Sequence, residues 1–140
     1  MFNTSISLDT LNSMSKGNMI EHLGIEFTEI QAGFIKAKMP VDHRTKQPLG
    51  LLHGGASVVL AETLGSVAVV LAVKDPQAET GVGVEINANH LKSAKGRYVI
   101  GTCIPLRIGR KIHVYEIKIH DEEENLICAS RLTVAIIPLK

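Results

Sequence analysis

One long apolar stretch limits how this chain can fold more than any other feature: residues 51–73, LLHGGASVVLAETLGSVAVVLAV. Its residues are apolar on nearly every side of a helix, which predicts a helix enclosed by the rest of the protein. The helix is expected to end near Pro76, because proline blocks its continuation. The stretch approaches the length of a membrane span, but Glu62 lies in its middle, and a carboxylate is costly at bilayer depth. We therefore expect the central helix of a soluble protein, with no membrane association.

The rest of the chain is dominated by strand patterns. Residues 115–120 alternate between apolar and polar side chains, the period of a strand with one exposed face. A short helix capped by Ser7 is expected first, followed by a turn around residues 18–23. Strands are predicted at 25–30, 34–40, 81–92, 96–106, 111–120 and 125–137. One crossover helix is too few for parallel βαβ units, so the order predicts a single α+β domain over residues 1–140, an antiparallel sheet wrapped around one long central helix.

Net charge and aromatic content argue against nucleic acid as a partner. The chain carries 15 Lys and Arg against 14 Asp and Glu, a net charge of +1, with no Trp, two Tyr and three Phe. Nucleic-acid-binding proteins usually carry a clear positive excess, and single-strand binders add exposed aromatic side chains. The first ten residues, MFNTSISLDT, lack the basic and apolar regions of a secretory signal, so a cytoplasmic protein is expected.

Neither a metal site nor a cofactor is predicted. The six histidines show no HxxxH or HxH spacing, and the two cysteines, Cys103 and Cys128, are far apart. Each cysteine lies in an apolar segment, so both are expected to be buried free thiols. The chain has no P-loop, and the Gly-x-Gly of GVGVEINANH leads into a strand, unlike a dinucleotide-binding fingerprint.

Glu62 is the only charged residue between His53 and Val73. A carboxylate removed from water is expensive unless it is paired, and such a group suits proton transfer or nucleophilic attack. The alternative is a structural glutamate bonded to a neighbouring loop or subunit. Ser66 lies one turn later on the same helical face, where it could bond the carboxylate, contact a ligand or bond back to the Glu62 carbonyl.

The triplet His53-Gly54-Gly55 opens the predicted helix. Free amide N–H groups and the positive end of the helix dipole meet at such a terminus, and glycines let a ligand oxygen approach the backbone. The position suits polarisation of a thioester or another carbonyl, as an oxyanion hole does, although the triplet could simply start a helix. Gln47, in the polar loop 41–52, could hold a water or a carbonyl because its amide both donates and accepts.

Residues 91–111 contain six basic residues and no acid: Lys92, Lys95, Arg97, Arg107, Arg110 and Lys111. If the strand prediction is right, they form two clusters at opposite ends of the strands. Small basic clusters beside an apolar site suit a phosphorylated small ligand, while ordinary solvated strand ends are the alternative.

Three segments together resemble the hotdog-fold acyl-CoA thioesterases: MPVDHRTKQPLGLLHGGASVVLAETLGS, VGVEINANHLKSAKG and PLRIGRKIHVYEIKIHDEEENLICASRLTVAI. The resemblance covers about residues 6–137. It is strongest to the bacterial group that hydrolyses 1,4-dihydroxy-2-naphthoyl-CoA in menaquinone biosynthesis. A similar group proofreads aryl-carrier protein in enterobactin synthesis. The resemblance implies a homotetramer built as a dimer of dimers, with an acyl-CoA thioester as substrate.

The resemblance also implies roles for individual residues. Gln47 and His53 of one chain would face Glu62 of the other across a dimer interface, and Glu62 would activate water or attack the thioester itself. The Gly54 N–H would polarise the carbonyl, and Ser66 would assist Glu62. The remaining residues implied in substrate binding are Gly55, His90, Lys92, Ser93 and Arg110.

Three other activities remain open besides the proofreading role: a broad acyl-CoA thioesterase, a hydratase or dehydratase on the same fold, and a non-catalytic acyl-CoA sensor.

Overall fold

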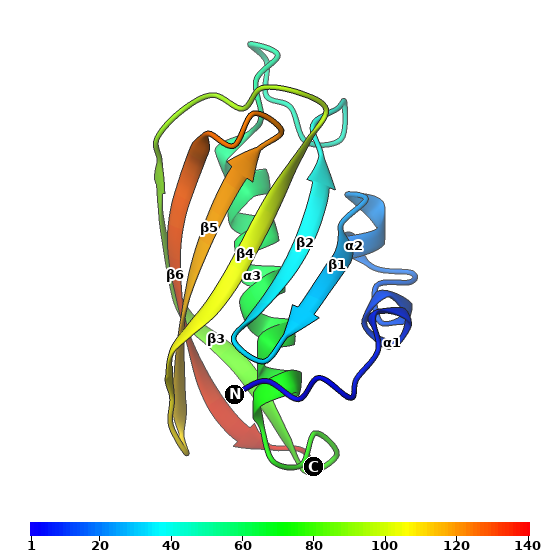
Figure 1. Ribbon diagram of the computed structural model, residues 1–140, viewed down its shortest axis with the longest axis vertical. Helices are drawn as coiled ribbons and strands as arrows, with labels where there is room; N and C mark the ends of the chain where they lie inside the picture. Colours follow the sequence, from blue (N-terminus) through cyan, green and yellow to red (C-terminus); the bar gives the residue numbers. More distant parts are fainter.

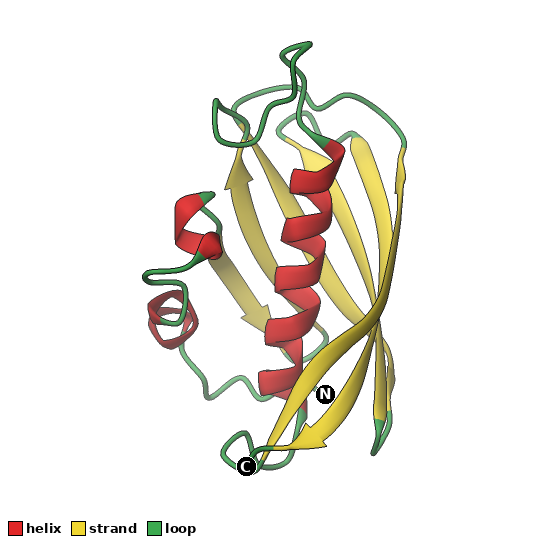
Figure 2. Ribbon diagram, turned by 180° about the vertical axis from the view of Figure 1, so that it is seen from behind, coloured by secondary structure: helices red, strands yellow, loops and turns green.

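A six-stranded antiparallel sheet curves around one long helix in the computed structural model, which describes residues 1–140 (Figures 1 and 2). In chain order the elements are α1 (Leu8–Ser13), α2 (Met19–His22), β1 (Glu26–Gln31), β2 (Phe34–Pro40), α3 (Gly54–Ala72), β3 (Glu79–His90), β4 (Tyr98–Ile108), β5 (Ile112–Asp121) and β6 (Leu126–Pro138). The predicted α+β architecture is confirmed, and each strand boundary lies within two residues of its predicted position. The turn expected at residues 18–23 contains the short helix α2, capped by Asn18.

The strand order in the sheet is β1-β2-β4-β5-β6-β3. After α3 the chain runs into β3 at the far edge, and β4 returns to pair with β2. The β4–β5 and β5–β6 connections are tight turns, as predicted, so the last three strands form a meander. The sheet consequently has two edges, β1 on one side and β3 on the other.

The core lies between α3 and the concave face of the sheet. On β5, Tyr115, Ile117 and Ile119 are fully buried while the residues between them point outward, which confirms the predicted alternation. On α3, Leu60 and Leu64 are fully buried. By length and composition alone α3 could cross a membrane, but 56% of its apolar window is buried inside this fold. The apolar stretch therefore serves as the core helix.

Both cysteines are buried free thiols, as predicted. Burial raises the pKa of Cys103 and also that of Cys128. Since the thiolate is the reactive form, neither side chain is suited to act as a nucleophile near neutral pH.

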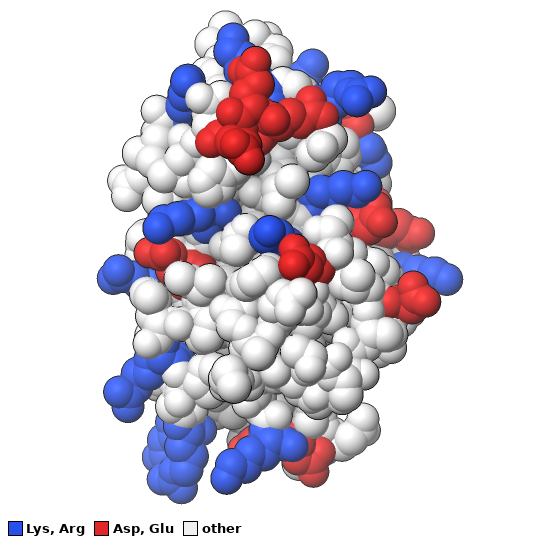
Figure 3. Space-filling view, in the orientation of Figure 1, with Lys and Arg blue, Asp and Glu red and all other residues white.

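The two basic clusters lie at opposite ends of β4, as predicted. Residues 92–97 precede this strand, and residues 107–111 form its other end and the turn that follows. Figure 3 shows basic side chains at the upper and the lower end of one face of the molecule, with a wide uncharged area in its lower centre.

Asp121, at the end of β5, ties the loop 91–97 to the β5–β6 turn. Its carboxylate accepts hydrogen bonds from the backbone N–H groups of Lys95, Glu123 and Asn125, at 2.8 to 3.0 Å. Burial opposes the charge, but these bonds outweigh it and lower the pKa of Asp121 from 3.8 to about 2. The charged form of Asp121 therefore stabilises the folded chain.

Replacing Asp121 by Asn should make stability less sensitive to acid. Because the pKa is lower in the folded chain, the carboxylate contributes stability above about pH 4, and this contribution is lost as the pH falls toward 2. Chemical denaturation at a series of pH values should show a shallower acid decline for Asp121→Asn than for the unaltered protein. Glu123→Gln, in the same turn, is the matched control and should keep the original slope. Equal slopes for Asp121→Asn and the unaltered protein would contradict the assignment.

Candidate active site

The first turn of α3 leaves a single amide free. The Nδ1 atom of His53 accepts a hydrogen bond from the Gly55 N–H at 2.7 Å, and the His53 carbonyl accepts from the N–H groups of Ala56 and Ser57 at 3.0 and 3.3 Å. Among the first four helical amides, only the Gly54 N–H donates to no protein group. This donor lies at the positive end of the helix dipole, so it is available to a partly negative ligand oxygen.

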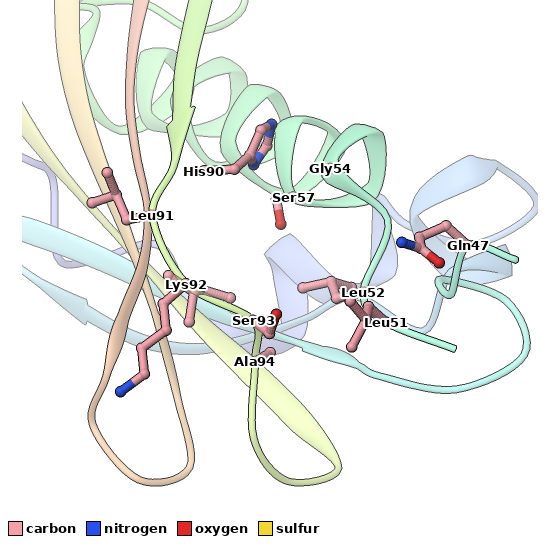
Figure 4. Close-up of a pocket in the computed structure, with 11 residues that line it drawn as sticks. Gln47, Leu51, Leu52, Gly54, Ser57, His90, Leu91, Lys92, Ser93 and Ala94 are labelled. Carbon is pink, nitrogen blue, oxygen red and sulfur yellow. The ribbon is translucent and has the colours of Figure 1, made fainter. Parts of the chain in front are cut away.

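A cavity of about 420 Å³ adjoins this amide. It lies between the start of α3, the end of β3 and the segment 91–94 (Figure 4). Its volume is in the range of small-molecule sites. Five of the residues singled out from the sequence line it together: Gln47, Gly54, His90, Lys92 and Ser93.

The ring of His90 packs directly on Gly54. A Cβ atom added at Gly54 would lie 2.9 Å from the Nε2 atom of His90, too close for an ordinary contact. The absence of a side chain at Gly54 therefore lets the His90 ring lie close to the helix terminus. The contact brings an imidazole nitrogen beside the free amide.

Gln47 presents a donor to the cavity. Its side-chain Oε1 accepts a hydrogen bond from the Leu49 N–H, which leaves the NH₂ group to donate. Figure 4 shows the amide nitrogen turned toward the cavity. The loop is anchored through Thr45, whose hydroxyl donates to the Pro40 carbonyl at 2.6 Å and whose carbonyl accepts from the His53 N–H at 2.8 Å.

Two residues in the wall of the cavity, Ser57 and Lys92, differ from what the sequence predicted. Ser57, which the sequence analysis missed, is buried and turns its hydroxyl into the cavity (Figure 4). Its position three residues after Gly54, as a polar residue in an apolar helix, was the available signal. The ammonium of Lys92 donates to Asn125 Oδ1 at 2.7 Å and points away from the cavity in Figure 4, so it is the Lys92 stem that forms part of the wall.

Glu62 lies farther along α3 and is half-buried. The hydroxyl of Ser66 donates to its Oε1 at 3.2 Å, so of the three partners considered for this hydroxyl, the structure selects the carboxylate. No Lys, Arg or His of the same chain forms an ion pair with Glu62. The carboxylate therefore has one neutral donor and keeps its Oε2 atom unengaged.

One chain does not bring all the predicted residues together. Glu62 follows Gly54 by eight residues, about 12 Å along the helix axis at a rise of about 1.5 Å per residue. Arg110 lines a separate cavity of about 430 Å³ near Ala72, at the other end of α3. In that cavity burial lowers the pKa of His113 and favours the neutral imidazole.

The arrangement suits chemistry at a carbonyl. It offers the half-buried carboxylate of Glu62 and, elsewhere on the same helix, the free Gly54 N–H at the positive helix end. A carboxylate can act as a general base or a nucleophile, and a free N–H can stabilise an oxyanion. No three His, Cys, Asp or Glu side chains are grouped so that they could hold a metal ion.

Comparisons with known proteins agree with this chemistry. Residues 49–128 match the sequence profile of the thioesterase superfamily. The chain is 53% identical over 132 residues to the 1,4-dihydroxy-2-naphthoyl-CoA hydrolase of Escherichia coli, covering 94% of this chain and 96% of the relative. It is 48% identical over 131 residues to the proofreading thioesterase EntH of Cronobacter turicensis, covering 94% of both.

Solved structures match over nearly the whole length. A thioesterase from Haemophilus influenzae superposes with a TM-score of 0.94 at 44% identity, covering 99% of this chain and 95% of the other. A mutant thioesterase from Pseudomonas aeruginosa gives a TM-score of 0.95 at 41% identity and covers 99% of both chains.

Proposed function

This chain belongs to the thioesterase superfamily and has its hotdog fold, and we propose that it hydrolyses an aromatic acyl-CoA thioester at an active site shared between two chains. Thioester hydrolysis is the activity of its close relatives. For the acyl group we propose 1,4-dihydroxy-2-naphthoate, released in the cytoplasm during menaquinone biosynthesis, because the more similar of the two curated relatives compared above is named for that reaction. The alternative is proofreading of aryl-carrier protein, the role named for the other relative.

The distance between Gly54 and Glu62 along α3 is the observation that supports a site shared between two chains. The group that attacks a thioester and the donor that binds its oxygen both lie roughly 3 Å from the reacting atoms. Gly54 and Glu62 of one chain are about 12 Å apart along a rigid helix, so they cannot serve the same carbonyl. A second chain can supply the missing partner.

The free edge of β3 provides a way for two chains to meet. It carries exposed apolar side chains, with Val82 46% and Val84 57% exposed, and an unpaired edge of this kind readily pairs with another strand. Pairing with β3 of a second copy about a two-fold axis would set the two α3 helices side by side and antiparallel. Glu62 of one chain could then face Gly54 of the other.

A second association would complete the proposed tetramer. Large apolar side chains stay exposed on β4 and at the start of β5 in the single chain, among them Leu106 and Ile112. Their burial between two dimers would account for an exposure that is unfavourable in water.

In the proposed mechanism Oε2 of Glu62 is the reacting atom, because Ser66 occupies Oε1. Oε2 either removes a proton from the attacking water or attacks the carbonyl carbon itself. Direct attack would release CoA thiolate and form an anhydride, which water then opens to the acid. In both routes negative charge develops on the carbonyl oxygen, where the partner's Gly54 N–H would stabilise it.

The remaining residues would hold the substrate. His53 uses Nδ1 as an acceptor, so its neutral ring carries the proton on Nε2 and can donate, as the Gln47 amide can. Both would position the carbonyl, the water or the leaving thiolate. His90 and Ser93 line the cavity, and Gly55 follows Gly54 in the first turn of α3. Lys92 and Arg110 remain candidates for binding the CoA phosphates. Arg110 is remote from the cavity at Gly54 of its own chain, so it would have to reach the site of a neighbouring chain.

Replacing Glu62 by Gln should abolish most hydrolysis while the protein still folds and binds CoA. The change keeps the side-chain shape and removes the base, which is worth roughly 10²–10⁴-fold in rate. Turnover can be followed by release of free thiol, and CoA binding by calorimetry. Glu116→Gln, on the outward face of β5, is the control and should retain full activity. Near-normal turnover of Glu62→Gln would refute the proposed role.

A panel of thioesters tests the substrate. We expect kcat/KM for 1,4-dihydroxy-2-naphthoyl-CoA to exceed that for benzoyl-CoA and for fatty acyl-CoA by at least about tenfold, a difference that pocket contacts can supply. A higher value for an aryl-carrier-protein thioester would favour the proofreading role, and equal values would favour a broad thioesterase. An enoyl-CoA that is hydrated without thiol release would indicate a hydratase, and tight binding with no reaction a sensor.

A further inference from the structure

Gly83, in β3, lies directly against the carboxylate of Glu62. A Cβ atom added at Gly83 would be only 2.6 Å from Glu62 Oε1. The backbone at Gly83 does not have a positive φ, so its conformation is open to any residue. A side chain at this position would therefore meet the Glu62 carboxylate, and the backbone conformation itself would not exclude it.

Gly81 and Gly83 form a matched pair on the same face of β3. Two residues apart on a strand, both face α3. A Cβ atom at Gly81 would lie 2.8 Å from Val69 and 2.6 Å from Val134. The strand thus lacks side chains at two successive positions that face the helix, which lets it approach the helix closely.

The strand is also irregular at this point. The pairing of β3 with β6 shifts register between Gly83 and Glu85, which leaves Val84 as an extra residue in a β-bulge. Bulges at sheet edges bend the strand and re-aim neighbouring groups, and they occur often beside active sites.

We propose that Gly83 is a positioning residue for Glu62, an inference that rests on the catalytic role proposed for that carboxylate. The Ser66 hydroxyl donates to Oε1 at 3.2 Å, and the bare backbone of Gly83 packs against the same atom. Oε2 lies farther away, 3.7 Å from the position of the added Cβ. The carboxylate is therefore held through Oε1, which leaves Oε2 free to meet the substrate.

An alanine at position 83 would displace the carboxylate at little cost in stability. To restore an ordinary contact, Oε1 must move by roughly 0.8 Å, which shifts it relative to the Ser66 hydroxyl that donates to it. The end of a flexible, half-buried side chain can make this movement easily. Catalysis is less tolerant, because a misplacement of about 1 Å in a reacting group can cost about 10²-fold in rate.

Gly83→Ala should lower kcat by about 10- to 100-fold, with KM for acyl-CoA changed less than about twofold and with the melting temperature and oligomeric state unaltered. Gly81→Ala is the control on the same face. Its new Cβ meets the branched side chains of Val69 and Val134, which cannot move away easily, so this variant should melt at lower temperature but retain kcat.

Two further backgrounds test whether Gly83 acts through Glu62. Adding Gly83→Ala to the Glu62→Gln variant should lower its residual kcat by less than about twofold, because no base remains to be misplaced. In a Glu62→Asp background the shorter side chain withdraws the carboxylate by about one bond length, about 1.5 Å, so Gly83→Ala should again cost little.

The inference is overturned if Gly83→Ala keeps normal kcat, if it costs as much in the Glu62→Gln background, or if it unfolds or dissociates the protein, since the glycine then serves the sheet. These outcomes are separate from failure of the proposed function. An active Glu62→Gln variant would refute the proposed function itself, whereas an inactive Glu62→Gln together with a fully active Gly83→Ala would refute only the positioning role.

Discussion

The fixed rise of an α-helix is the constraint on which the rest of this structure depends. Gly54 and Glu62 lie on the same rigid helix, about 12 Å apart along its axis, and no side-chain rotation brings the amide and the carboxylate to one carbonyl. The two groups have complementary chemistry, since a free amide can stabilise negative charge and a carboxylate can act as a base. A protein with this helix can use both on one substrate only by associating with a second copy.

The environment of α3 differs between its buried face, its first turn and the region beside Glu62. The sheet encloses most of the helix and buries Leu60 and Leu64. This burial stabilises the helix, which is apolar and so has no salt bridges between its own side chains. At its first turn His53 satisfies three of the four terminal amides and leaves that of Gly54 free. Beside Glu62 the sheet ends at the glycine-containing edge of β3, so the carboxylate lies next to the edge at which a second chain would pair.

Much of this arrangement was predictable from local patterns. Alternation placed the strands, and Glu62 was conspicuous as a single charge in an apolar helix, so both followed from residues close in sequence. Features that depend on long-range contacts were not predictable. The pairing of the Lys92 ammonium with Asn125, 33 residues away, is one example. Gly83 is another, because a glycine in a strand gives no local sign of the side chain that it accommodates.

Subunit mixing tests the shared site most directly. Glu62→Gln and Gln47→Ala each damage a different half of the proposed site, so either variant alone should be nearly inactive. Coexpressed in equal amounts, they should assemble at random, and half of the dimers should contain one chain of each kind. Each mixed dimer would have one intact site, so the mixture should recover about a quarter of the normal activity. A mixture no more active than the average of its two components would show that each chain works alone and would contradict the account.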